Sequence, residues 1–322
     1  MEVITENKIT TDKANQDVFS ETLQQLAAND KDIIAVTSDS RGSGKLVPFG
    51  KKYPKQIVEV GIAEQNLVGV AAGLASTGKK VFAVSPACFL TARAFEQIKN
   101  DVAYSDNPVK CVGISAGVSY GALGTTHHSL HDFAALRAVN NITIVAPADN
   151  FETAEAVKAA AKTNKPFYLR FGKKTMPLLN AENTEFKFGK GRVIKEGNDI
   201  AIVANGETVW PALQAAIKLE NEFGIQATVV SMHTIKPLDT ELLEKLAVNC
   251  GAIITVEEHS VYGGLGEACA SFLIQHNLNI PFKIIGIPDE YTVTGSQIEI
   301  FNYYGISENG IAEAVIKLKG KK

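Results

Sequence analysis

The chain has 322 residues, 45% of them hydrophobic and 21% charged, which is typical of soluble globular domains and unlike disordered segments. Its formal net charge of −3 gives no electrostatic argument for a nucleic-acid or anionic-membrane partner. The longest apolar runs have the length of strands, and residues 1–6 lack the basic and apolar parts of a secretory signal.

The first half of the chain alternates short apolar strands with helices. We expect strands at 33–37, 57–60, 81–84, 109–114, 142–145 and 166–171, and helices at 15–29, 64–76, 89–104, 132–139 and 151–163. Short apolar strands separated by helices predict a parallel sheet that helices cover on both faces.

The alternation stops at residues 172–198, where we expect a linker with a short hairpin. A second series follows, with strands at 200–204, 226–231, 252–257 and 282–287 and helices at 207–222, 239–248, 265–277 and 308–318. We therefore predict an α/β protein of two doubly wound domains with mostly parallel sheets, at residues 10–175 and 190–322.

The segment from Ile57 to Ala75 carries the first candidate for catalysis. An apolar strand runs into Gly61, and a helix of small residues opens so soon afterwards that Glu64 falls in its first turn. A carboxylate at such a packed junction can be partly desolvated, which tunes it as a proton donor or acceptor. The structural alternative, which spacing alone favours, is that Glu64 complements the helix dipole and the free amides.

Two segments resemble transketolases and other thiamine-diphosphate enzymes. Residues 61–66, Gly-Ile-Ala-Glu-Gln-Asn, match a Gly-Ile-x-Glu segment, which implies that Glu64 protonates the aminopyrimidine ring of the cofactor. Residues 85–98 end in Arg-Ala-Phe-Glu-Gln-Ile and are similar to a transketolase run that ends in Arg-Ala-Phe-Asp-Gln-Ile. By that match Phe89 stacks on the cofactor pyrimidine and Arg93 is a candidate for substrate binding.

A glycine-rich stretch at residues 117–132 holds three histidines just before a predicted helix. His127 and His131 have the i, i+4 spacing of metal ligands, but no cysteine or further ligand pair accompanies them. Such a junction after a parallel strand is where α/β folds place ligands, and histidine there suits proton transfer to a polar substrate. The stretch also resembles a transketolase loop, which implies that Thr126 and His127 contact the sugar, although Leu123 stands where the family often has Asp.

The turn at residues 37–43, Thr-Ser-Asp-Ser-Arg-Gly-Ser, follows a predicted strand and is similar to a Thr-Ala-Asp turn of transketolases. The resemblance places Asp39 near the cofactor cleft and Ser43 near the distal end of the substrate. Without it, a turn capped by Asp39 is the simpler interpretation.

A further glycine run, Gly263–Gly266, opens a predicted helix in the second domain and could cradle a pyrophosphate. A nucleotide-dependent oxidoreductase would depend on this loop, although the first strand of the domain lacks any such loop. The same run resembles the carboxy-terminal domain of transketolases, where it serves structure and subunit contact. His259, just before the loop, is a secondary candidate.

No Gly-Asp-Gly occurs in the 322 residues. Transketolases hold the cofactor diphosphate through a divalent cation that binds such a motif in a separate domain. The resemblance covers essentially the whole chain but only the pyrimidine-binding and carboxy-terminal domains, which implies one subunit of a split transketolase. We expect thiamine diphosphate and Mg²⁺ as cofactors, with no metal ligand in this chain and the metal bound by an amino-terminal diphosphate-binding partner. The expected assembly is an α2β2 heterotetramer with a homodimer contact through this chain.

The implied reaction transfers a two-carbon ketol unit from a ketose to an aldose. Transketolases of phosphosugars usually carry Thr-Arg-Lys near the start of this domain, but here residues 11–13 are Thr-Asp-Lys, and Lys173 replaces a second arginine. An ammonium cannot form the bidentate contact of a guanidinium, so we expect a differently phosphorylated, branched or sulfonated sugar, read by Arg41, Ser43 and Lys173.

Besides the nucleotide-dependent oxidoreductase, three alternatives stay open. A 2-oxoacid dehydrogenase beta subunit and a deoxyxylulose-phosphate synthase share the fold and the glutamate, and a non-catalytic regulatory subunit would not need Glu64. The four cysteines, at 88, 111, 250 and 269, have no paired spacing and fit buried thiols in a reducing cytoplasm, where we expect the protein.

Overall fold

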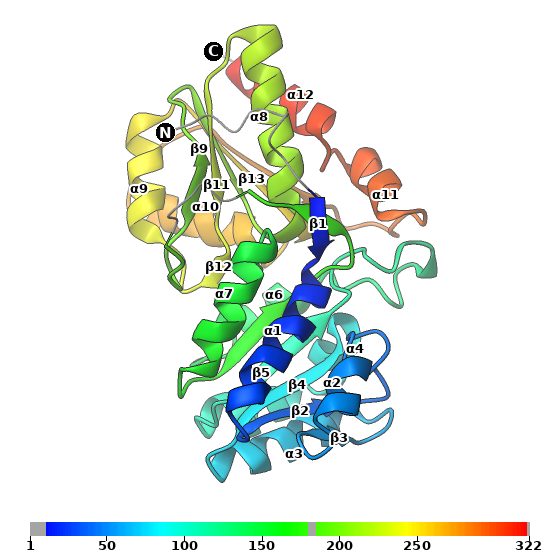
Figure 1. Cartoon of the computed structure of the whole chain (residues 1–322). Helices are drawn as coiled ribbons and strands as arrows, with labels where there is room; N and C mark the ends of the chain where they lie inside the picture. The colour runs from blue at the N-terminus through cyan, green and yellow to red at the C-terminus, as the bar shows by residue number, and fades with distance from the viewer. Residues whose placement is uncertain (1–10, 180–184, 321–322) are drawn as a thin grey trace.

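The computed structural model describes residues 11–179 and 185–320, which form two α/β domains, one above the other in Figure 1. The parallel strands of the first sheet are β2 (Ile33–Thr37), β3 (Ile57–Glu59), β4 (Lys80–Pro86), β5 (Lys110–Ile114), β6 (Thr143–Val145) and β7 (Phe167–Arg170). The helices around it are α1 (Asn15–Asn29), α2 (Val47–Lys52), α3 (Glu64–Ser76), α4 (Ala87–Arg93), α5 (Phe95–Gln97), α6 (Asp132–Arg137) and α7 (Asn150–Ala161), with a π-helical turn η2 (Ile98–Tyr104) and a 3₁₀ turn η3 (Gly121–Leu123).

The second sheet contains β9 (Arg192–Lys195), β10 (Ile200–Ala204), β11 (Ala227–Ser231), β13 (Ile253–Ser260) and β14 (Phe282–Ile287). Its helices are α8 (Val209–Phe223), α9 (Thr240–Asn249), α10 (Leu265–Gln275), α11 (Gln297–Tyr304) and α12 (Glu308–Lys319), with a 3₁₀ turn η4 (Gly206–Thr208). The strand order is β14-β13-β10-β11-β9, and only the edge strand β9 runs antiparallel among the described residues.

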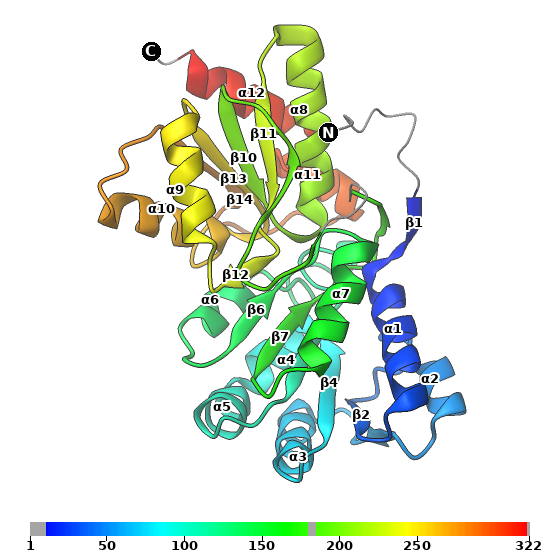
Figure 2. The same cartoon turned by 60° about the vertical axis from the view of Figure 1, so that its left-hand side comes forward.

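Helices cover both faces of each sheet, which Figure 2 shows from a second direction. In β2, Ile34 and Val36 pack in a core with α3, α4 and α6, whereas Ile33 and Ala35 pack in a core with α1, α2 and α7. Successive strand residues point to opposite faces, so one apolar strand supplies both cores. The second sheet likewise separates two apolar cores. The predicted pair of doubly wound, mostly parallel domains is confirmed.

One strand joins the domains. The first sheet has the order β12-β6-β7-β5-β4-β2-β3, and its edge strand β12 (Thr234–Lys236) comes from the second half of the chain and pairs antiparallel with β6. The sequence pattern did not indicate β12, because three residues carry no usable period and their partner lies about ninety positions away.

Three other details differ from expectation. The hairpin expected within 172–198 is wrong: β8 (Thr175–Pro177) pairs with β1 (Thr11–Ala14), and β9 pairs with β11. The single helix expected at 89–104 is broken at Ala94 into α4, α5 and η2. The short helices α2 and α11 were not expected. No helix among the described residues is long and apolar enough to cross a membrane.

Candidate functional site

Parallel strands end at one edge of a sheet, so the turns after β2, β3, β4 and β5 meet at the carboxyl edge of the first sheet. Helix α3 opens there with Glu64, which is only 4% exposed. Arg93, at the end of α4, donates through Nη1 to both carboxylate oxygens of Glu64, at 2.9 and 3.1 Å. Among the described residues, the Glu64 carboxylate accepts from Arg93 and from no helix amide, which disfavours a pure capping role.

Three aromatic rings continue from this ion pair. The Arg93 guanidinium carbon lies 4.2 Å from the centroid of the Phe89 ring. Phe89 contacts the ring of His127 edge-on at 5.3 Å, and His127 contacts Tyr120 in the same way at 5.3 Å. Lys173 Nζ lies 4.6 Å from the centroid of the Tyr120 ring. We call Phe89, His127 and Tyr120 the aromatic row; it joins a buried carboxylate at one end to a lysine at the other.

The His127 ring is oriented by its neighbour. Thr126 Oγ1 lies 2.9 Å from His127 Nδ1. Within the described parts of the chain no partner is found for Nε2, which leaves that nitrogen for a ligand. At the far end of the row, burial raises the pKa of Tyr120, and the nearby hydroxyls of Ser115 and Ser43 oppose that rise. Ser43 therefore lies beside the Tyr120 end.

Asp39 and Arg41 belong to a second, adjacent cluster. Glu59, the last residue of β3, accepts the Asp39 amide at 2.7 Å and lies 3.2 Å from Arg41 Nε. Burial alone would raise the pKa of Glu59, but hydrogen bonds from the Asp39 amide and the Thr37 hydroxyl outweigh it, so the pKa is lowered. The side chain of Asp39 is exposed, on a residue with φ of +55°.

Five of the eight residues named from the sequence thus lie in one contact chain: Glu64, Arg93, Phe89, His127 and Lys173. Tyr120 and Glu59 were not predicted. Tyr120 stands in the same glycine-rich stretch as His127, so an aromatic residue beside a turn glycine was the available signal. The side chain of Asp12 lies outside the residues that the structure describes.

The histidines do not form a metal site in the described chain, which contains no group of three or more His, Cys, Asp or Glu residues able to hold a metal ion. His127 packs in the aromatic row, whereas His131 Nε2 lies 3.4 Å from Thr91 Oγ1. His128 is buried and bonds to the Gly121 carbonyl at 2.9 Å, which holds the loop.

A side chain of the protein itself occupies the Gly263–Gly266 loop. The buried carboxylate of Glu257 accepts the amides of Leu265 and Gly266 at 2.7 and 2.8 Å, so these two amides at the start of α10 are not available to a pyrophosphate. A Cβ on Gly264 would lie 1.9 Å from Glu257 Oε2, which explains the glycine. His259 is also structural: it is buried against Phe133, and burial lowers its pKa to about 4.

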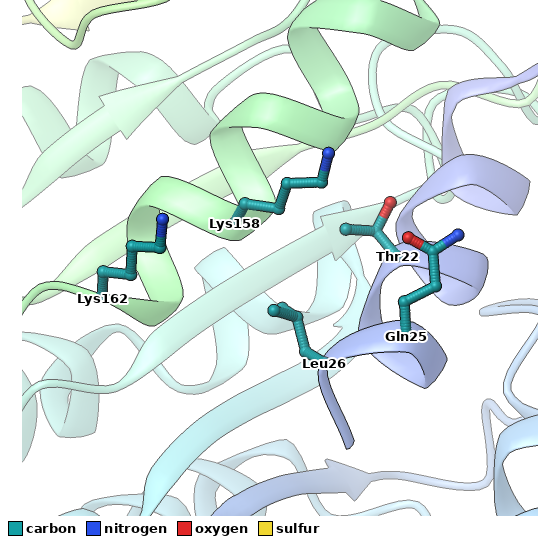
Figure 3. A pocket seen from close by; sticks show the side chains of 5 residues that line it. All are labelled: Thr22, Gln25, Leu26, Lys158 and Lys162. Carbon is teal, nitrogen blue, oxygen red and sulfur yellow. The ribbon is translucent and has the colours of Figure 1, made fainter. Parts of the chain in front are cut away.

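A separate hollow of about 200 Å³ lies between α1 and α7 (Figure 3). It is lined by Thr22, Gln25 and Leu26 from α1 and by Lys158 and Lys162 from α7. None of these residues takes part in the aromatic row. Lys158 is already paired with Glu155 at 2.9 Å, so the hollow adds nothing to the candidate site.

Comparison with known proteins agrees with this geometry. Residues 11–177 match the family model of the transketolase pyrimidine-binding domain, and residues 189–311 match that of the transketolase C-terminal domain.

The chain belongs to the transketolase family.

Among its relatives, a subunit of the apulose-4-phosphate transketolase of Phocaeicola vulgatus is 49% identical over 94% of this chain and 96% of its own length. A 6-deoxy-6-sulfo-D-fructose transketolase subunit of a Clostridium species is 33% identical over 95% of each chain. A solved structure, described as a split gene transketolase in an inactive beta4 tetramer, is 37% identical with a TM-score of 0.85 and covers 95% of this chain and 98% of its own. Matches to 1-deoxy-D-xylulose-5-phosphate synthases are weaker and cover about half of those proteins.

Proposed function

We propose that this chain is the pyrimidine-side subunit of a thiamine-diphosphate-dependent split transketolase, which transfers a two-carbon ketol unit from a ketose to an aldose. The observation that carries the proposal is the buried carboxylate of Glu64, bonded to Arg93, which in turn lies over the ring of Phe89, in a transketolase chain whose relatives of equal length are named as subunits. In this proposal the pyrimidine-binding domain is residues 10–175 and the C-terminal domain residues 190–322, with β12 contributed to the first sheet.

The residues of the site fit one ring of the cofactor. A buried carboxylate and an aromatic ring that share Arg93 as a neighbour suit a nitrogen-containing ring, which Glu64 would protonate and Phe89 would pack against. We assign Asp39, in the turn after β2, to the same cofactor cleft. Thiamine diphosphate, when bound, supplies the electron sink for making and breaking the carbon–carbon bond next to a ketone. His127, with Nδ1 beside Thr126 and Nε2 open, is placed to hydrogen-bond a sugar oxygen and to exchange a proton with it.

The partner completes the site. We assign the diphosphate and its Mg²⁺ to an amino-terminal subunit, in an α2β2 assembly with a contact between two copies of this chain. Ile62, two residues before Glu64, is 74% exposed, which supports an interface close to the cofactor. All four cysteines are free and buried, which supports a reducing cytoplasm.

The far end of the row favours an anionic sugar of unusual shape. We propose that Lys173, Ser43 and Arg41 bind the anionic group. Arg93, which bonds Glu64 through Nη1, is the further proposed substrate contact. Lys173 offers a point charge instead of a guanidinium fork. Relatives named for apulose 4-phosphate and for sulfofructose support a branched sugar phosphate or a sulfonated sugar.

The test is reconstitution with a diphosphate-domain subunit. We expect ketol transfer that depends on thiamine diphosphate and Mg²⁺, no turnover by this chain alone, and a higher kcat/KM for branched or sulfonated sugars than for xylulose 5-phosphate and fructose 6-phosphate. Ketol transfer by the isolated chain would contradict the split site. Decarboxylation of a 2-oxoacid without ketol transfer would favour a dehydrogenase or synthase instead.

A further inference from the structure

Two glutamates that the proposed mechanism does not use are buried together between the domains. Glu207, in η4, is 5% exposed, and Glu258, in β13, is 2% exposed. Both come from the carboxyl ends of neighbouring strands of the second sheet. The side-chain amide of Gln297, the first residue of α11, donates to both: 2.7 Å to Glu207 Oε2 and 2.8 Å to Glu258 Oε1.

Each glutamate also holds one backbone segment of the first domain. Glu258 Oε1 accepts the amide of Val118 at 2.9 Å, in the loop that presents Tyr120 and His127. Glu207 Oε1 accepts the amide of Lys174 at 3.2 Å, next to Lys173. These segments supply the two residues at the far end of the aromatic row and the lysine beyond them.

Two glycines make room for these contacts. A Cβ on Gly117 would lie 2.1 Å from Glu258 Cδ, and a Cβ on Gly172 would lie 2.1 Å from Glu207 Oε1. Distances under 3.0 Å require something to move, so neither position accepts a side chain while its glutamate is in place. Each segment thus pairs a glycine with a carboxylate.

The charges around the pair are unequal. Arg170 faces Glu258, with Nη1 4.0 Å from Oε2 and Nη2 donating to the Glu258 carbonyl at 2.8 Å, and it also pairs with the buried Asp132. The hydrogen bond from Gln297 and the positive charge of Lys174 lower the pKa of Glu207, but its burial and the charge of Glu258 outweigh them. Burial and the charge of Glu258 accordingly raise the pKa of Glu207 to about 8.

We infer that Glu207 and Glu258, joined through Gln297, are positioning residues that hold Tyr120, His127 and Lys173 in register for the far end of the substrate. The inference rests on the proposed function for the identity of that substrate. Burial and mutual repulsion disfavour ionisation of both glutamates together, and ionisation of both at alkaline pH would place two carboxylates on one amide, which loosens both segments.

The experiment measures KM for the sugar, kcat and cofactor affinity from pH 6 to 9.5 in the complex with the partner subunit. For the wild type we expect KM to rise above pH 8, the side on which Glu207 ionises, with a smaller change in kcat. Glu207→Gln keeps the volume without the charge: KM should rise about fivefold at pH 7 from one lost hydrogen bond, and the alkaline rise should disappear. Gln297→Met and Gly172→Ala should raise KM at every pH, with cofactor affinity unchanged.

Asp149→Asn is the matched control, because Asp149 is also buried, has a pKa raised to about 6 by burial, and accepts the amide of Leu179 away from the aromatic row. It should change thermal stability and leave KM and its pH dependence as in the wild type. If Glu207→Gln behaves like this control, the two glutamates are structural only and the inference is overturned.

A second measurement separates this inference from the proposed function. Hydrogen exchange at the amides of Val118 and Lys174, followed on this chain without partner or substrate, should accelerate in Gln297→Met and, in the wild type, accelerate above pH 8 beyond the intrinsic pH dependence of exchange. That result supports the inference even if reconstitution yields no ketol transfer. Unchanged protection of both amides in Gln297→Met would overturn it, whatever activity the complex has.

Discussion

The pair of Arg93 and Glu64 beside the aromatic row and the pair of Arg170 and Asp132 at the domain boundary both set an arginine against a carboxylate, but in different surroundings. The side chain of Arg93 is 49% exposed where it meets Glu64, whereas that of Arg170 is 5% exposed where it meets Asp132 at 2.8 Å. Exposed pairs contribute about 0–1 kcal/mol to stability, whereas breaking a buried pair costs about 3–5 kcal/mol. The contact between Arg93 and Glu64 is therefore open to exchange with a ligand, and that between Arg170 and Asp132 is not.

The hydrogen bonds to the two carboxylates, Asp132 and Glu64, differ in the same way. Asp132 accepts the Tyr168 hydroxyl at 2.7 Å and Arg170 Nε at 2.8 Å, and both donors are buried. Glu64 is held by one half-exposed side chain. A carboxylate that binds a ligand must exchange a hydrogen bond within the protein for one to the ligand. Glu64 can do so, because its partner is half-exposed, whereas Asp132 cannot.

The largest expected effect is at Glu64. Glu64→Gln should slow hydrogen–deuterium exchange at the cofactor C2 in the reconstituted complex by ~10²–10⁴, because the amide can no longer transfer a proton to the ring. Unfolding by urea should change by less than about 1 kcal/mol, because Arg93 is half-exposed and stays solvated when Gln replaces its partner. Glu96→Gln, at an exposed glutamate on α5, is the control and should change neither. Wild-type exchange in Glu64→Gln would mean that the carboxylate serves only Arg93.

At Arg192 we expect a large loss of stability. Arg192 lies 2.6 Å from Glu152 and 3.8 Å from Asp149, in a second buried group between the domains. Arg192→Met should lower the free energy of unfolding by about 3–5 kcal/mol, because it leaves buried carboxylates without a cation. Lys190→Met removes a half-exposed lysine paired with Glu241 and should cost at most about 1 kcal/mol. If Arg192→Met and Lys190→Met lowered the free energy of unfolding equally, buried and half-exposed ion pairs would not differ in their contribution to stability.

The sequence predicted the parts of the fold that depend on local pattern. Helices α1 and α3 begin and end where the pattern placed them, because apolar period and small residues are local properties. Strands β9 and β12 and the contacts of Gln297 were not predicted, because their partners lie roughly thirty to ninety positions away and no periodicity encodes them.

The same limit applies to the site. Glu64, Phe89 and His127 could be named because their segments resemble transketolase segments, and because turns after parallel strands meet at one sheet edge. Tyr120 could not be placed, since its role depends on the rings and the lysine around it. The bond between Arg93 and Glu64 was also missed: the resemblance assigned Arg93 to the substrate, and in the structure its guanidinium is shared by Glu64 and Phe89.

The smallest expected effect tests whether the aromatic face matters apart from its bulk. Phe89→Leu keeps most of the apolar volume and removes the ring that Arg93 and His127 contact. An aromatic contact adds about 0.5–1.5 kcal/mol beyond area burial, so the Kd of thiamine diphosphate in the reconstituted complex should rise about 2- to 13-fold, with a smaller change in kcat.

Phe95→Leu is the matched control, since Phe95 packs against the core of the first domain. Calorimetric titration and urea unfolding should show opposite patterns: Phe89→Leu weakens cofactor binding at nearly constant stability, and Phe95→Leu lowers stability at constant Kd. If Phe89→Leu lowers stability as Phe95→Leu does and leaves Kd unchanged, Phe89 is a core residue and the row is not a ligand surface at that end.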